Sequence, residues 1–338
     1  MKLVDIIERY TTLSIIGMSK NSGKTTALNS IVEQFDSKSK TLALTSIGRD
    51  GEEVDIVTST EKPKIYVKNG TIIATAKKMV FECDTAKEIL KTTGINTPLG
   101  EIIIFKARSD GYVQTAGPSM NDQIVTVCED LKKLGADKVI VDGALHRKSI
   151  SSPNVTEATI LCTGASFGKR IDKVVEETEH VYRILSLEQV EEEVINIVKR
   201  REESEKVIVI DGDFSYNSIN LQTTLDTRVN VKPFVSENTK YIFLAGVVTD
   251  SILEDMSKQN INLRKIKFIA MDSSKVIVKP ETYNKILMRG SNILVLKKTN
   301  LVAITINPVS AYGYNFDKNE FKERLETRVK IPVLNVLD

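Results

Sequence analysis

The residues best suited to chemistry form one short run near the N-terminus, Gly23-Lys24-Thr25-Thr26. An apolar segment at residues 13–17 precedes this run and predicts a β-strand. The following stretch predicts an amphipathic helix, because its apolar side chains recur at helical spacing: Leu28, Ile31, Val32 and Phe35. A strand, a loop and a helix in this order place backbone amides and a positive helix N-terminus around phosphate oxygens. The sequence therefore predicts a phosphate-binding P-loop.

Each residue type in this loop has a task. Gly23 lets the backbone approach the phosphates closely, Lys24 reaches the β- and γ-phosphates, and Thr25 offers a hydroxyl to Mg²⁺. The spacing departs from the strict G-x-x-x-x-G-K-[ST] pattern, since Met18 holds the place of the first glycine and Gly17 comes one residue early. The predicted nucleotide-binding set is Lys20, Asn21, Ser22, Gly23, Lys24, Thr25 and Thr26. Within this set, Lys20 is either an additional phosphate contact or a solvated loop lysine.

A P-loop also needs an acid that holds Mg²⁺ or orders the attacking water. Asp142 ends the apolar run 138–142, and parallel strands deliver their carboxyl ends to the crevice where the P-loop lies. We expect Asp142 to be catalytic together with Lys24 and to share the metal with Thr25. The alternative is that Asp142 caps the next turn. Asp50 is a second candidate for the metal, and His146 either lines the site or is structural.

Motifs that are absent from the sequence indicate which nucleotide base is bound and exclude disulfide and cysteine zinc sites. It carries no [NT]-K-x-D segment, which guanine-specific P-loop proteins use to read the base, so we expect the cofactors ATP and Mg2+. The three cysteines, Cys83, Cys128 and Cys162, are far apart and in no C-x-x-C spacing. A disulfide framework or a cysteine zinc site is therefore not expected, and buried thiols are.

The composition narrows the range of partners. The chain has 338 residues, of which 47 are basic and 45 acidic, so a net charge of +2 provides no field that would steer it onto nucleic acid or an anionic membrane. Aromatic residues make up 6% and Trp is absent, which argues against a base-stacking surface. No uncharged run reaches the ~20 residues of a membrane span, and the N-terminus lacks a signal-peptide block. We expect a cytoplasmic protein that binds neither nucleic acid nor membrane.

The chain length predicts two domains. Apolar strands alternate with helical patterns in the first half, which predicts an α/β fold with a parallel-sheet P-loop domain at residues 1–200. A charged stretch then marks a boundary, and a second, smaller α/β domain is expected at residues 206–338. Asn69-Gly70 between two β-rich runs predicts a hairpin over residues 64–75, and an apolar helical stripe ending at Gly135 predicts a helix over 124–134. The other predicted strands are 41–46, 101–105, 138–142, 159–162, 207–210, 241–245, 267–271, 293–296, 302–306 and 332–336.

Five segments together resemble a known family. They are SIIGMSKNSGKTT at 14–26, TSIGRDGE at 45–52, AGPS at 116–119, VDGALHRKS at 141–149 and AITINPVSAYGY at 303–314. They are similar to the KamB-like P-loop subunit of lysine 5,6-aminomutase reactivases, and the resemblance spans nearly the whole chain. From chemistry alone, the turn-rich segment at 307–313 is either a functional loop or a plain surface turn.

The resemblance implies the ATP-binding subunit of a reactivating factor for a cobalamin-dependent aminomutase of lysine fermentation. Such a factor couples ATP hydrolysis to the exchange of damaged cobalamin, with a MutS-like ATPase subunit as its implied partner, and homo-oligomer formation stays open. An alternative function is an ATP-dependent ligase or kinase resembling dethiobiotin synthetase, which phosphorylates a small carboxylate or carbamate. A nucleotide-gated regulator without turnover is a third hypothesis.

Overall fold

The computed structural model describes residues 2–35, 40–48, 64–144, 152–220, 230–259 and 261–337. The chain divides into two compact units, the first containing Met1–Glu179 and Asn300–Asp338 and the second containing His180–Thr299. The predicted division differs, because it placed everything after residue 206 in the second domain. The physical reason is that β17 (Leu301–Asn307) and β18 (Val333–Asn335) return to the sheet of the first unit and pair there.

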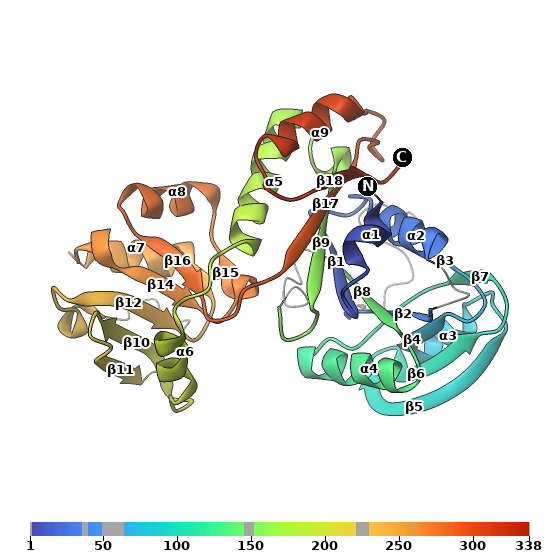
Figure 1. Cartoon of the computed structure of the whole chain (residues 1–338), viewed down its shortest axis with the longest axis horizontal. Helices are drawn as coiled ribbons and strands as arrows, with labels where there is room; N and C mark the ends of the chain where they lie inside the picture. Colours follow the sequence, from blue (N-terminus) through green and yellow to red (C-terminus); the bar gives the residue numbers. More distant parts are fainter. Residues whose placement is uncertain are drawn as a thin grey trace. The chain divides into compact units, whose positions relative to one another are not determined.

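A nine-stranded mixed sheet forms the centre of the first unit, in the order β18-β17-β9-β1-β8-β2-β4-β6-β5 (Figure 1). The further bounds are β1 (Thr12–Gly17), β2 (Leu42–Ser46), β4 (Ile72–Ala76), β5 (Lys87–Thr97), β6 (Gly100–Ala107), β8 (Lys138–Ala144) and β9 (Ala158–Gly164). The strands from β18 to β4 are parallel, whereas β6 is antiparallel to both β4 and β5. Both β1 and β9 are buried along their whole length, as central strands of a parallel sheet are when helices cover both faces. The expected α/β class is confirmed.

Helices cover the two faces of this sheet. The helices of the first unit are α1 (Leu3–Ile7), α2 (Lys24–Gln34), α3 (Lys77–Phe81), α4 (Asn121–Lys133), α9 (Lys318–Glu326) and the first part of α5 (Ile171–Leu185). Ile7 of α1 and Ile31 of α2 share one buried cluster with Ile15 of β1. On the other face, the hydroxyl of Thr163 in β9 lies 2.8 Å from that of Thr178 in α5. The alternation of side chains along each strand thus gives the sheet two covered faces.

The local predictions for α4 and for the cysteines are confirmed. The apolar stripe of α4 is buried, and the helix ends as predicted: Gly135 has a φ of 95°, and its N–H donates to Lys132 O over 3.0 Å. All three cysteines are buried free thiols. No helix within the described residues is long and apolar enough to cross a membrane.

The predicted hairpin over residues 64–75 is wrong. Gly70 does have a positive φ of 95°, but the two flanking strands belong to different sheets. β3 (Ile65–Val67) pairs antiparallel with β7 (Gly111–Val113), whereas β4 lies between β2 and β6. All five residues of β4 are buried, so burial in the centre of the large sheet outweighs the local turn signal.

The second unit contains a five-stranded sheet in the order β11-β10-β12-β14-β16. Its strands are β10 (Glu205–Asp211), β11 (Tyr216–Asn220), β12 (Thr239–Leu244), β14 (Lys267–Ala270) and β16 (Asn292–Val295), and β13 (Val248–Thr249) pairs separately with β15 (Val276–Ile277). Its helices are the end of α5, α6 (Glu192–Lys199), α7 (Asp250–Lys258) and α8 (Pro280–Met288). Apolar residues of α7 and α8 fill one face of the sheet, and those of α6 fill the other (Figure 1). The strands predicted in this region are confirmed.

Candidate functional site

The candidate site lies at the carboxyl end of β1, in the loop of residues 18–23 that connects β1 to α2 (the 18–23 loop). β1 is flanked by β8 on one side and by β9 on the other. After β1, the chain continues to β2, which lies on the β8 side of β1. After β9, its next strand in this sheet is β17, which lies on the opposite side of β1. The direction in which strands are added to the sheet therefore reverses next to β1, and open α/β sheets form a ligand crevice at such a point.

Gly17 explains the unusual spacing of the loop. A Cβ on Gly17 would lie 2.3 Å from Ser22 Oγ and 2.8 Å from Lys24 Cγ, so any side chain there would collide with the returning loop. Beyond it, Asn21 and Gly23 have positive φ values of 59° and 89°, in the left-handed region that asparagine and glycine tolerate best. The glycine that precedes Met18 thus supplies the space for the tight return of the chain.

The loop leaves polar groups without protein partners. Ser22 is only 1% exposed, and its hydroxyl has no hydrogen-bond partner among the described residues. No described side chain caps the first turn of α2, which begins at Lys24 immediately after the left-handed Gly23. An uncapped helix N-terminus presents backbone N–H groups and a positive dipole, and these groups bind anions well. The residues present therefore fit a phosphate group.

Lys24 of α2 and Asp142 of β8 lie near enough for the charge of Lys24 to act on the Asp142 carboxyl. Asp142, partly buried in β8, is in register with Ile15 of β1, and its carbonyl accepts a hydrogen bond from Ile47 N over 3.0 Å. Burial raises the pKa of the Asp142 carboxyl, while the charge of Lys24 and the N–H of Gly143 lower this pKa. The ammonium of Lys24 reaches back over the loop and lies 3.4 Å from Ser19 O. A cation and a carboxylate thus share the edge of the sheet at which the loop lies.

The other predicted site residues divide into those on the loop and those outside the described structure. Thr25 and Thr26 are partly buried in the first turn of α2, and Lys20 and Asn21 are exposed on the loop. Asp50 lies outside the described residues, and so does His146. No group of three or more His, Cys, Asp or Glu side chains that could hold a metal occurs in the described part of the chain. Any metal here would therefore rely on oxygens such as those of Thr25 and Asp142 together with the ligand.

A residue that was not predicted as a site residue, Asn307, also lies at the loop. It is the last residue of β17, and its Cβ lies 2.8 Å from the position that a Cβ on Gly23 would occupy. The segment that follows was interpreted as either a functional loop or a plain turn. Its start at the candidate site, next to Gly23, favours the functional interpretation.

Segments far apart in the sequence converge on this edge of the sheet. Gly117 N donates a hydrogen bond of 3.1 Å to Ser46 Oγ, and Gly48 N donates one of 2.9 Å to Pro118 O, so the segment before α4 crosses the carboxyl end of β2. Ser46 is in turn in register with Asp142. The described parts of all five resembling segments, 14–26, 45–48, 116–119, 141–144 and 303–314, thus extend to the carboxyl edge of this sheet.

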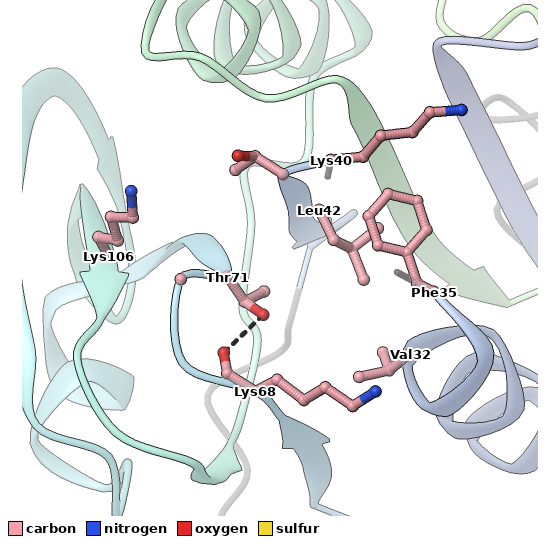
Figure 2. Close-up of a pocket in the computed structure, with 9 residues that line it drawn as sticks. Val32, Phe35, Lys40, Leu42, Lys68, Thr71 and Lys106 are labelled. Atoms are coloured by element: carbon pink, nitrogen blue, oxygen red, sulfur yellow. Dashed lines mark hydrogen bonds between the residues drawn. The ribbon is translucent and has the colours of Figure 1, made fainter. Parts of the chain in front are cut away.

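A cavity of about 100 Å³ lies at the opposite edge of the sheet from the 18–23 loop, near the amino ends of β2 and β4 (Figure 2). Lys40, Lys68 and Lys106 line it, but their ammonium groups do not point toward a common centre. Lys68 Nζ donates to Glu33 O over 2.8 Å at the end of α2, and Lys40 Nζ pairs with Glu8 over 3.3 Å. The carbonyl end of α2 also disfavours an anion, so this cavity is not a competing phosphate site.

No protein-family model, no curated protein and no solved structure matches this chain.

Proposed function

We propose that the first unit is a P-loop domain that binds MgATP and hydrolyses it. The observation that carries this proposal is a loop whose tight return requires Gly17 and in which the buried Ser22 hydroxyl has no hydrogen-bond partner among the described residues. No described side chain caps the helix N-terminus that follows, and the charge of Lys24 acts on the carboxyl of Asp142. Such a loop is suited to bind phosphate oxygens through its backbone amides.

The roles of the individual residues follow from their chemistry. Residues 20–26 would surround the phosphates, and the Lys24 ammonium would bind the oxygens that gain charge during transfer to water. The Thr25 hydroxyl and the Asp142 carboxylate would hold Mg²⁺, which neutralises charge on the β- and γ-phosphates. Burial opposes ionisation of Asp142, and the positive charge of Lys24 offsets part of this effect.

At the level of the whole protein, we infer the ATP-binding subunit of a reactivating factor for a cobalamin-dependent aminomutase. The support is that all five segments of the reactivase resemblance have described parts that extend to one edge of one sheet. ATP can drive cofactor exchange only if its bound states prefer different conformations of the mutase. The proposal includes a cytoplasmic protein, a MutS-like ATPase subunit as partner, and no role for nucleic acid.

One experiment tests both levels. ATP binding is measured calorimetrically. Phosphate release is measured for the chain alone, with an inactivated aminomutase and the MutS-like subunit, and with small carboxylate or carbamate substrates. A reactivase subunit should hydrolyse ATP slowly alone, and faster with the mutase, and it should restore mutase activity only with ATP and adenosylcobalamin. Turnover that depends on a small substrate would instead favour the ligase or kinase alternative. Absence of ATP binding would overturn the whole proposal.

A further inference from the structure

Asn307 packs closely against two glycines, Gly164 and Gly23, at the carboxyl edge of the large sheet. It is in register with Gly164 of β9, where an added Cβ would lie 2.6 Å from Asn307 O and 3.1 Å from Asn307 Cβ. On its other side, an added Cβ on Gly23 would lie 2.8 Å from Asn307 Cβ. The side chain of Asn307 thus occupies the space beside Gly23, the left-handed residue that immediately precedes α2.

The side chain of Asn307 is itself held in place. Its Oδ1 accepts a hydrogen bond of 3.1 Å from Val309 N, the first peptide N–H of the loop that follows. Its Nδ2 has no hydrogen-bond partner among the described residues and lies 3.6 Å from the position of a Cβ on Gly23. The amide group is therefore oriented by its own loop, and the side chain lies alongside Gly23 of the 18–23 loop.

The loop of residues 308–316 (the 308–316 loop) is closed and anchored. Ser310 N donates to Tyr314 O over 3.1 Å, and Phe316 N donates to Pro308 O over 2.9 Å, which closes the loop on itself. Two side-chain bonds then attach it to the turn after β9, η2 (Ala165–Phe167). Ala311 N donates to Ser166 Oγ over 3.0 Å, and the Tyr314 hydroxyl donates to Ala165 O over 3.0 Å. The loop that follows Asn307 is thus held both by its own hydrogen bonds and by the turn after the neighbouring strand β9.

We propose that Asn307 is a positioning residue for the phosphate-binding loop and that the 308–316 loop, attached through Tyr314 and Ser166, holds it there. This inference rests on the proposed ATP site. Amides bind phosphate tightly only if they are ordered before the ligand arrives, because ordering them on binding reduces the affinity. Asn307 packs against Gly23 and blocks outward movement of the 18–23 loop at that residue. A side chain on Gly23 would collide with Asn307. Asn307 should therefore affect the affinity for the phosphate chain of the nucleotide and not the affinity for its base.

The experiment uses Mg-tripolyphosphate, which carries the phosphate chain without sugar or base, beside MgATP. Affinities for both are measured calorimetrically for the parent, for Asn307→Ala and for Tyr314→Phe, with the melting temperature and circular dichroism of each. Tyr312→Phe serves as the matched control, since Tyr312 is 57% exposed on the same loop and makes no side-chain hydrogen bond within the described residues. Tyr314→Phe removes a single hydroxyl, so it keeps the test meaningful if Asn307→Ala does not fold.

We expect both test variants to bind tripolyphosphate and ATP about fivefold more weakly, the factor that corresponds to one hydrogen bond of ordinary strength. The control should bind tripolyphosphate like the parent. A lower melting temperature with unchanged tripolyphosphate affinity would reduce Asn307 to a purely structural role and overturn the inference. A loss confined to ATP would also overturn it, because Asn307 would then act on the base or sugar. If the parent binds neither ligand, the proposed function fails and this inference fails with it.

Discussion

The ammonium of Lys24 offsets part of the free-energy cost of burying the carboxylate of Asp142. The two residues come from different elements, the first turn of α2 and the last half of β8, and their charges interact because β1 and β8 are paired in parallel with Ile15 opposite Asp142. Burial nevertheless outweighs Lys24, and the pKa of Asp142 stays raised. Functional sites often contain a carboxylate whose burial lowers the stability of the folded protein.

Asp142→Asn should stabilise the protein in the absence of nucleotide and depress ATP hydrolysis. The sign follows from the raised pKa: the folded state binds the proton more tightly than the unfolded state, so ionisation at neutral pH costs folding free energy, and a neutral amide does not carry that cost. Melting temperature and phosphate release test the two parts. Asp84→Asn, at an exposed position, is the control and should change neither. A lower melting temperature for Asp142→Asn would contradict this prediction.

Lys24→Ala should strongly weaken ATP binding and leave the fold intact, because it removes the ammonium and little buried surface. A charged hydrogen bond to phosphate contributes about 1.5–3 kcal/mol, so the affinity should fall at least about tenfold. Titration calorimetry measures this loss, and circular dichroism checks the fold. Lys173→Ala removes an exposed lysine from α5 as a control. ATP affinity equal to that of the parent in Lys24→Ala would remove the basis of the P-loop assignment.

Gly17→Ala should disrupt the loop although alanine is the smallest change available. The added methyl group would lie 2.3 Å from Ser22 Oγ and 2.8 Å from Lys24 Cγ, and overpacking of this kind costs about 1–3 kcal/mol. We expect reduced stability together with a loss of ATP affinity. Gly168→Ala is the matched control, because its added Cβ would meet Val174 at an ordinary 3.5 Å. If both variants bind ATP like the parent, Gly17 does not have the proposed role.

Acid should weaken the second unit through Glu191. The Tyr241 hydroxyl donates a hydrogen bond of 2.7 Å to Glu191 Oε1, and Lys240 Nζ lies 3.1 Å from the same oxygen. Both hydrogen bonds lower the pKa of Glu191, and the bond from Tyr241 has the larger effect. A lowered folded-state pKa gives stability that is present above the unfolded-state pKa and is lost as the pH falls through the folded-state value. Tyr241→Phe should therefore be less stable than the parent at pH 7, and the difference should shrink toward pH 3.

Urea unfolding at several pH values, followed by circular dichroism, measures this difference. Tyr216→Phe is the control, since Tyr216 is 51% exposed on β11 and makes no side-chain hydrogen bond within the described structure. A difference between Tyr241→Phe and the parent that stays constant across the pH range would assign the effect to packing and not to the ionised Glu191.

The sequence by itself determined the features that depend on neighbouring residues. The strand–loop–helix around Gly23, the end of α4 at Gly135, and β10, β12, β14 and β16 of the second unit were predicted, because apolar periodicity and a glycine at a helix end are local properties. The same reasoning predicted Asp142 near the carboxyl end of a parallel strand, since such ends share one edge of the sheet, and Asp142 lies in the last half of β8.

Only the tertiary structure decided which distant segments meet. The return of β17 to the first unit puts Asn307 against Gly23, and no local pattern records that pairing. The separation of β3 and β4 into two sheets likewise depends on partners far along the chain, which overrode the turn signal of Gly70. The physical reason is that β-pairing is decided by burial against non-local strands, whereas helix ends and tight turns are decided within a few residues of the chain.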